Sequence, residues 1–306
     1  MKSLFKKRAF ALFEIFVGLI PILGGTLAIF KFLENREYPQ LVIMSMMIVT
    51  IIAITAFFAI RNWRNYYLKL VACADAFHNF NHLVRDEFYK LRHLKKQNAL
   101  NKSILLSNLD LTSQESVNIL SKLLTELTGH KIHVHLKIFG QNEKSNEITS
   151  EHILTTLCIS KGAPGERMNA INGKSKHKVG DNTHLSLLFI DKQPHFAASN
   201  LRKKALNYFR GDNQINFKCS SENWRDRYRS VVVVPIRIEK LDGNTPVFEN
   251  LGVLFCDSEV NKAFRNFEME HMINIVKNFA DGLYTYLDRI SYLLAEIEDK
   301  NQTQTS

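Results

Sequence analysis

The sequence is poor in cysteine, and its few cysteines form no motif. Cys73, Cys158, Cys219 and Cys256 are widely spaced, and no two of them form a CxxC pair. Disulfide-rich secreted domains and structural zinc sites both need cysteines that are more numerous or more closely spaced. The pattern therefore excludes a disulfide framework and a cysteine-based zinc site, and it is typical of a reducing cytoplasm.

The sequence also lacks the common catalytic motifs. It contains no G-x-S-x-G, no P-loop and no H-E-x-x-H, and no cysteine has an evident histidine partner. His133 and His135 share a strand face with Lys131 and Lys137. These lysines would repel a metal cation, so a solvated strand face is favoured over a metal site completed by a third histidine. We predict no catalytic residue, no metal ligand and no enzyme.

Two long stretches contain almost no charge. Between Ala9 and Phe30 the only charged residue is Glu14, and between Leu41 and Ile60 there is none. Each stretch has the length of about 20 residues that a helix needs to cross a membrane. A cleaved signal peptide is the alternative for the first stretch, but the stretch is too long for one and a second span follows closely. We predict a transmembrane hairpin over residues 1–60, with spans at about 9–30 and 41–60.

Basic residues next to the spans indicate their orientation. Four of them precede the first span, and Arg61, Arg64 and Lys69 follow the second. The connection between the spans carries only Lys31 and Arg36, which two glutamates balance. By the positive-inside rule both termini are cytoplasmic, which places the chain in an inner membrane as a multi-pass protein.

The net charge of +10 is concentrated beside the membrane. Residues 1–60 contribute +3, residues 61–102 contribute +6, and residues 103–306 contribute only +1. Juxtamembrane lysine and arginine attract anionic headgroups by about 1 kcal/mol each. The charge thus indicates membrane lipid as a partner and argues against nucleic acid.

Two helices have apolar residues in the 4-3 spacing of helices that pair. The first predicts a juxtamembrane stalk over residues 61–110, most simply paired with its own copy in a homodimer or a higher homo-oligomer. Asn81 would fix the register of such a coiled coil, or would face water on a globular helix. The second helix, from Met269 to Ile297, would cover a sheet and pair across the dimer, and residues 300–306 form a frayed tail.

The segment between these helices mixes helix and strand patterns. Thr112 and Glu115 have the spacing of a capping box, and Gly129 ends the helix that follows. "KIHVHLKIF" and "HILTTLCIS" predict strands, and "GDNTHLSLLF" predicts a short helix. "PHFAASN", "SVVVVPIRI" and "FENLGVLFCDS" predict three more strands. The order indicates an α+β domain over residues 113–299, with a mostly antiparallel central sheet flanked by helices.

The ordered set "DNTHLSLLFIDKQPHFAASN", "YRSVVVVPIR" and "ENLGVLFCDS", followed by a long apolar helix, resembles a GAF domain. The resemblance covers about residues 113–290. It implies a PAS-like fold that holds a small molecule between the sheet and the helices of one face, and dimerisation through flanking helices. It does not identify the ligand or a cofactor, because cyclic nucleotides, bilins, haem and amino acids all occur in the family.

The position of the family's pocket implies a set of candidate ligand-binding residues. These precede the central strand or belong to the segment opposite: Asn182, Thr183, Phe196, Asn200, Trp224, Arg227 and Tyr228. An arginine fork beside aromatic rings suits an anionic, ring-bearing or nucleotide-like ligand. The alternative is that the arginines pair with Glu222 and Asp226 on a solvated loop.

The sequence thus predicts a membrane-anchored cytoplasmic sensor that binds a small molecule and signals through dimeric helices. One alternative is a ligand-triggered effector of bacterial defence whose hairpin disrupts the membrane. Another is a GAF-like dimerisation scaffold that binds no ligand.

Overall fold

The computed structural model describes Gly25 and residues 39–140, 147–163, 175–210, 217–220, 224–242, 245–264 and 266–305. The chain divides into two compact units, residues 1–71 and residues 72–306. The predicted first span lies outside the described residues, so the two-span hairpin stays a prediction.

One described helix is long and apolar enough to cross a membrane. This helix, α2 (Pro39–Lys96), contains the predicted second span and continues without a break into the predicted stalk. Side chains of the span, such as Met47, Ile51 and Phe58, are exposed in the isolated chain. A lipid environment would remove this apolar surface from water.

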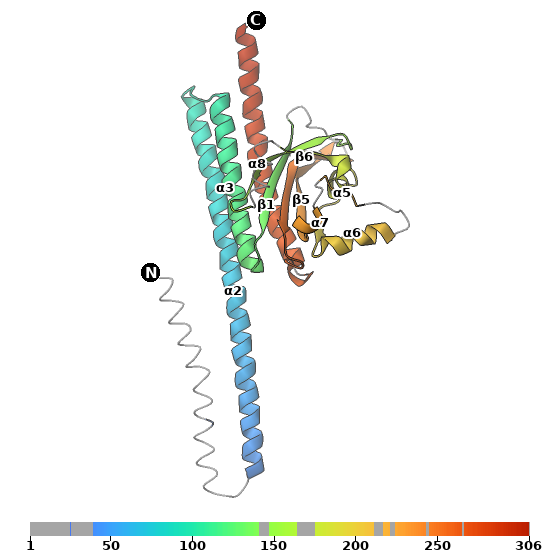
Figure 1. Cartoon of the computed structure of the whole chain (residues 1–306). Helices are drawn as coiled ribbons and strands as arrows, with labels where there is room; N and C mark the ends of the chain where they lie inside the picture. The colour runs from blue at the N-terminus through green and yellow to red at the C-terminus, as the bar shows by residue number, and fades with distance from the viewer. Residues whose placement is uncertain are drawn as a thin grey trace. The chain divides into compact units, whose positions relative to one another are not determined.

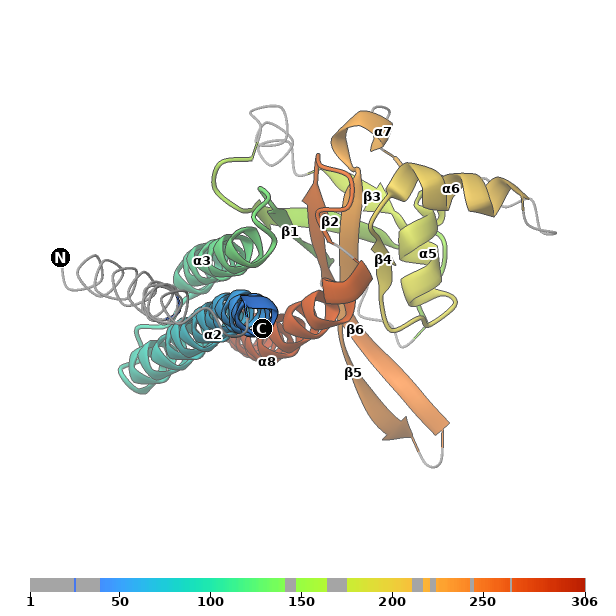
Figure 2. The same cartoon turned by 90° about the horizontal axis from the view of Figure 1, so that it is seen from below.

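Residues 72–306 contain a six-stranded antiparallel sheet with the strand order β3-β2-β1-β6-β5-β4. The strands are β1 (His133–Phe139), β2 (Ile153–Ile159), β3 (Lys176–Lys178), β4 (Phe196–Ala198), β5 (Ser230–Asp242) and β6 (Thr245–Ser258). The long β5–β6 hairpin extends past the rest of the sheet (Figure 2). The predicted α+β class and antiparallel sheet are confirmed.

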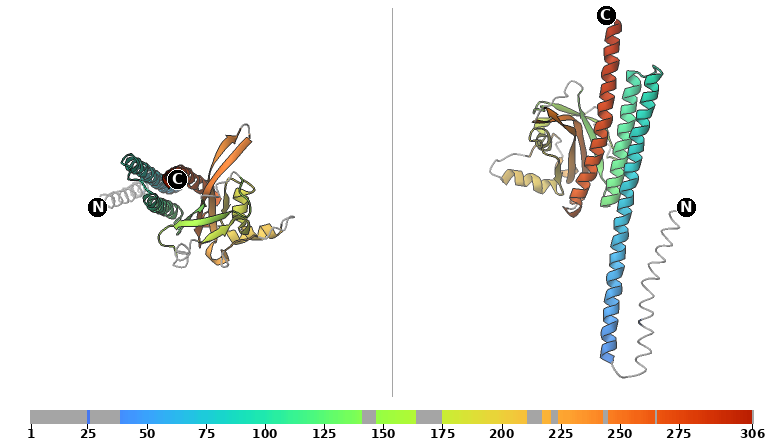
Figure 3. Two further views of the ribbon diagram at one scale, coloured as in Figure 1. Left: turned by 90° about the horizontal axis from the view of Figure 1, so that it is seen from above. Right: turned by 180° about the vertical axis from the view of Figure 1, so that it is seen from behind.

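The helices form layers on both faces of this sheet (Figures 1 and 2). One face carries α3 (Lys102–Thr128) and α8 (Asn266–Thr305), which lie alongside each other (Figure 3). The other face carries α5 (Thr183–Phe189), α6 (Leu201–Arg210) and α7 (Trp224–Arg227), preceded by the short helix η2 (Val179–Asp181). The sequence analysis predicted neither β3 nor α6 and α7.

Successive side chains of a strand point to opposite faces of the sheet. The apolar residues of the central strands therefore belong to two separate cores, one on each face. Val134, Leu136, Val232 and Leu254 join the core with α3 and α8. Their neighbours of opposite parity, such as Phe255, join the core with α5 and α6. The sheet is therefore covered on both faces, and the second core surrounds the candidate site.

Helix α3 begins earlier than its sequence pattern predicted. The Asn101 side chain caps it, accepting a hydrogen bond of 2.9 Å from the Ile104 amide. Thr112, the predicted cap, lies inside the helix and is buried. Gly129 ends the helix as predicted, with a φ of 69° that glycine adopts without a steric penalty. At the other end of the chain, α8 continues to Thr305, past the predicted start of the frayed tail.

The C-terminal half of the predicted stalk packs inside its own chain. Phe77 and Phe80 of α2 contact Phe279 of α8, with ring centroids 5.1 and 4.5 Å apart, and Phe88 contacts Tyr286 at 6.0 Å. The apolar stripe was predicted to meet a second copy, but from Phe77 onward it meets α8. Trp63, Tyr67 and Leu70 at its start remain exposed, so dimerisation through that part stays a prediction.

Gly282 of α8 allows the closest approach of α2. A Cβ atom at this position would overlap the Phe80 ring, 2.9 Å from its Cζ atom. Replacing glycine by alanine in a helix normally stabilises it by about 1 kcal/mol. Overpacking against Phe80 costs about 1–3 kcal/mol. We therefore expect Gly282→Ala to lower the thermal midpoint of the full chain.

The control for this prediction is the same change in a Phe80→Leu background, where the ring is absent and the helix propensity of alanine remains. There, Gly282→Ala should be neutral or stabilising. An equal effect of Gly282→Ala in both backgrounds would contradict the contact between α2 and α8.

Candidate ligand-binding site

Phe255 lies at the centre of a row of aromatic and polar side chains across the sheet. His135 on β1, Phe255 on β6, Val233 on β5 and Phe196 on β4 are in register as cross-strand neighbours. The His135 ring is 5.7 Å from the Phe255 ring, centroid to centroid, and meets it edge to face. The Tyr228 ring meets Phe255 in the same geometry at 5.5 Å. Together these rings form an aromatic floor on the sheet.

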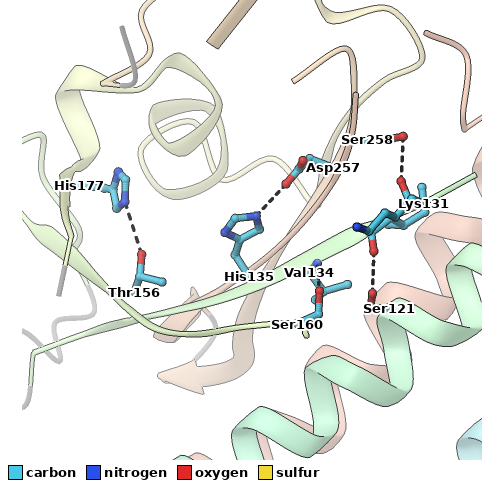
Figure 4. A network of polar contacts seen from close by, with 10 residues as sticks. Ser121, Lys131, Val134, His135, Thr156, Ser160, His177, Asp257 and Ser258 are labelled. Carbon is cyan, nitrogen blue, oxygen red and sulfur yellow. Dashed lines mark hydrogen bonds and ion pairs between the residues drawn. The ribbon is translucent and has the colours of Figure 1, made fainter. Parts of the chain in front are cut away.

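A buried ion-pair partner holds His135 in place. Its Nε2 atom lies 2.8 Å from the Asp257 carboxylate, and both side chains are almost fully buried (Figure 4). A short hydrogen bond to a carboxylate fixes the orientation of the ring. This contact also means that Asp257 has a partner of its own.

Lys137 lies two residues further along the same face of β1. Its Nζ atom is 5.6 Å from the centroid of the Phe255 ring. Among the described residues, it makes no hydrogen bond and no ion pair. Burial lowers the pKa of Lys137 to about 8, with nearby Cys219 and Asp257 acting in the opposite direction. At neutral pH this lysine therefore remains mostly protonated.

His184 of α5 closes the site from above the sheet. It is only 6% exposed, and its ring lies 5.4 Å from Phe255 and 6.1 Å from Phe196. Within the described part of the chain, neither ring nitrogen forms a hydrogen bond. Burial, reinforced by the positive charge of Lys137, lowers the pKa of His184 to about 3. The imidazole is therefore neutral, with one donor and one acceptor nitrogen available.

His177 has a structural role at the edge of this site. Its Nε2 atom contacts the Thr156 hydroxyl (Figure 4). The same atom contacts the Ser175 hydroxyl, and the Nδ1 atom contacts the Ser220 hydroxyl at 3.1 Å. Burial is the main reason that the pKa of His177 falls to about 3, and the charges of Lys137, His184 and His135 add to it. His177 thus ties β3 to residues 217–220.

Two of the predicted site residues, Asn182 and Thr183, fix the wall of the site. The Asn182 Oδ1 atom accepts hydrogen bonds from the amide and the hydroxyl of Ser220. The Thr183 hydroxyl accepts one of 2.7 Å from the Lys218 amide. Both side chains are buried and use these contacts to hold residues 217–220 against α5.

The predicted aromatic residues Phe196, Trp224 and Tyr228 all lie in the core of this face. Trp224 packs on Phe217 with ring centroids 5.0 Å apart. The Lys204 Nζ atom lies 4.4 Å from the Phe196 ring and donates a hydrogen bond to the Ala197 carbonyl. Of the three, Tyr228 contacts Phe255 directly, while Trp224 supports the wall from behind.

The last two predicted residues, Asn200 and Arg227, belong to elements other than the strand of Phe255. Asn200 lies just before α6, and Arg227 ends α7. The Asn200 side chain accepts a hydrogen bond from the Lys203 amide at the start of α6. Arg227 is half-buried at the end of α7. Glu222, one of its alternative partners, lies outside the described residues.

The structure corrects the expectation that the polar face of β1 is solvated. His133 and His135 are 2% and 5% exposed. The reason is topological: β1 pairs with β2 on one side and β6 on the other, and α5 covers its polar face. The sequence analysis therefore missed His135, Lys137, His184, Phe255 and Asp257. For His135 and Lys137 the one signal was a row of polar residues in β1, a strand that lies between β2 and β6 in the sheet.

Among the described residues, no three histidine, cysteine, aspartate or glutamate side chains lie close enough to hold a metal ion. On the opposite face of the sheet, a largely apolar cavity of about 530 Å³ lies between α3, α8 and the ends of β1 and β2. On the Phe255 side, Lys137 and His184 form no hydrogen bond among the described residues.

Comparisons with known proteins give no close relative. No family model matches the chain, and no curated protein matches it. A GAF domain/HD domain protein from Geobacter sulfurreducens is 14% identical, with a TM-score of 0.35 over 61% of this chain and 96% of the other. A type II free methionine-R-sulfoxide reductase from Thermoplasma acidophilum is 12% identical, with a TM-score of 0.35 over 58% and 96%. We infer neither the fold nor the function from likenesses this low.

The expectation that the chain is not an enzyme is nevertheless corrected. The solved structures that it resembles include free methionine-R-sulfoxide reductases, which are enzymes. One of them, from Neisseria meningitidis in complex with its substrate, is 15% identical with a TM-score of 0.32 over 60% of this chain and 89% of the other.

The low pKa of His184 predicts a specific acid lability. An unfolded histidine titrates near pH 6.5, so between about pH 6.5 and 3 the unfolded chain binds one more proton at this position than the folded chain. The free energy of unfolding should therefore decrease with falling pH in that window, by up to about 1.4 kcal/mol per pH unit. We expect His184→Gln to remove this contribution in denaturant titrations between pH 7 and 5.

The matched control is His271→Gln, because His271 is exposed on α8. This variant should keep the pH dependence of the wild type. If His184→Gln also kept it, the desolvation of His184 would be refuted.

Proposed function

We propose that this chain is a membrane-anchored sensor whose α+β domain binds a small molecule over Phe255. The ligand lies between the β1–β6–β5 face of the sheet and the layer formed by α5 and residues 217–220. One observation carries the proposal: half-buried Lys137 and buried His184 both lie beside the Phe255 ring and form no hydrogen bond among the described residues.

The free-energy cost of leaving polar groups unpaired supports this interpretation. A buried polar group without a partner destabilises a protein by about 1–3 kcal/mol, and a charged group by more. Buried groups with shifted pKa values gather at functional sites because a ligand supplies the missing partner. His135, His177 and Asp257 on the same face of the sheet all have partners, whereas Lys137 and His184 form no hydrogen bond among the described residues.

The residues around Phe255 also have the composition of a small-molecule site. Such sites are mostly apolar and aromatic, with a few polar groups that orient the ligand. Here Phe196, Tyr228 and Phe255 supply the rings, and Asn182 and Thr183 hold the wall. In this proposal Phe196 and Tyr228 contact the ligand, while Asn182, Thr183, Asn200 and Trp224 position the contact residues.

The anchor is the span at the start of α2, together with the predicted first span. Trp63, Tyr66 and Tyr67 follow the span and are exposed, in company with Arg61. Aromatic and basic residues of this kind gather where helices leave the bilayer on the cytoplasmic side. This supports our proposal that both termini are cytoplasmic and that the basic surface meets anionic lipid.

The proposed signal passes through α8 to α2. Helix α8 packs on β5 and β6 from the opposite side of the sheet, and Phe80 of α2 packs on Gly282 of α8. A ligand that binds one packing arrangement of the sheet more tightly than another would shift α8, and with it the helix that contains the span. The exposed residues Trp63, Tyr67 and Leu70 supply a surface for pairing with a second copy.

The test is native mass spectrometry of the full chain extracted from membranes in mild detergent. We expect a co-purifying small molecule, and we expect His184→Trp to remove it, since the larger ring would occupy the space beside Phe255. The chain should stay in the membrane pellet after an alkaline carbonate wash.

The matched control is Leu106→Trp, because Leu106 lines the cavity on the opposite face of the sheet. This variant should retain the molecule. A wild-type chain that carries nothing and gains no stability from a metabolite panel would contradict the binding role, and release by carbonate would contradict the anchor.

A further inference from the structure

We propose that the ligand is a small organic anion whose carboxylate or phosphate group pairs with the Lys137 ammonium and accepts a hydrogen bond from His184. The inference rests on the proposed function and specifies the class of ligand at the same site. The two acid groups share the chemistry that the site recognises, and the experiment below distinguishes them.

The titratable groups that face Lys137 come from β1, β3, β6, α5 and residues 217–220. None of them forms an ion pair with Lys137 among the described residues. On β6, Asp257 is bound to His135 of β1. His177 of β3 and His184 of α5 are neutral at pH 7, because burial keeps the pKa of each at about 3. Cys219, in residues 217–220, acts with Asp257 to raise the pKa of Lys137, but Lys137 forms no ion pair among the described residues. The ammonium therefore lies half-buried without an opposite charge in direct contact with it.

This arrangement discriminates between classes of ligand by charge. A cationic ligand would be repelled by Lys137, and a neutral ligand would leave the ammonium unpaired in a medium that strengthens every electrostatic interaction. An anion supplies the missing charge and forms the stronger, charge-assisted kind of hydrogen bond. The charge of Lys137 thus favours a ligand with an acid group over a cationic or a neutral ligand.

His184 gives the site a second, directional contact. Its ring is 94% covered and its nitrogens form no hydrogen bond within the described part of the chain. The His184 ring and the Lys137 Nζ atom lie 5.4 and 5.6 Å from the Phe255 ring centroid. In the proposal a single acid group meets both, with one oxygen at the ammonium and another at the imidazole N–H. The organic part then packs on Phe255 and Tyr228, whose rings favour flat or apolar groups.

The experiment measures the thermal midpoint of the detergent-solubilised full chain with four added probes. The probes are sodium acetate, inorganic phosphate, the neutral acetamide, and sodium chloride at matched ionic strength. We expect acetate or phosphate to raise the midpoint and acetamide and chloride to leave it unchanged. The stronger of the two anions identifies the acid group.

Lys137→Met provides the decisive comparison, because it removes the charge but keeps much of the apolar side chain. We expect it to raise the midpoint of the ligand-free chain by about 2–4 °C, since a half-buried charge without a counter-ion is lost, and to abolish the anion response. Lys137→Arg should retain part of that response. Lys131→Met, at an exposed position just before β1, should retain all of it.

An unchanged anion response in Lys137→Met, or a lowered midpoint in that variant, would overturn the inference. A response to acetamide equal to that of acetate would also overturn it, yet leave the proposed small-molecule site in place. If the wild type carried no molecule and no probe changed its midpoint, both proposals would fail.

Discussion

Desolvation of Lys137 is the constraint on which the candidate site depends. The ammonium lies on the polar face of β1, beneath α5, with its natural counter-ion Asp257 already bound to His135. The same low-polarity surroundings keep His184 neutral. Lysine and histidine in such a position lower the stability of the ligand-free protein, because burial removes part of their hydration and no group of the described residues replaces it. A partner from outside the chain would supply the missing interactions.

The two faces of the sheet have different roles in this proposal: one packs against helices in an apolar core, and the other carries the groups that bind the ligand. On one face, Val134, Leu136 and Leu254 pack with α3 and α8 into an apolar core that needs no ligand. On the other, paired polar groups hold the wall: Asn182 and Thr183 fix residues 217–220 to α5. Of the recognition groups, Lys137 lies on β1 and His184 on α5. On the far face, α8 packs on β5 and β6 and contacts Phe80 of α2.

Local patterns in the sequence predicted the central strands, the end of α3 at Gly129 and the long helix α8, because each depends on neighbouring residues. The predictions of a cap at Thr112 and of a solvated His135 were wrong. Phe77 contacts α8 of its own chain, and pairing of the stalk with a second copy stays a prediction. The aromatic wall around Phe196 and Tyr228 was predicted, since it follows the motif order. Lys137 and His184 were missed because their burial arises only when α5 folds over β1.

The most direct test of this account is an experimental structure of the full chain purified from its native membrane. The account predicts density for a non-protein molecule with an acid group within hydrogen-bonding distance of Lys137 Nζ and His184. Protein side chains filling that space, with a carboxylate of the chain itself against Lys137, would contradict it.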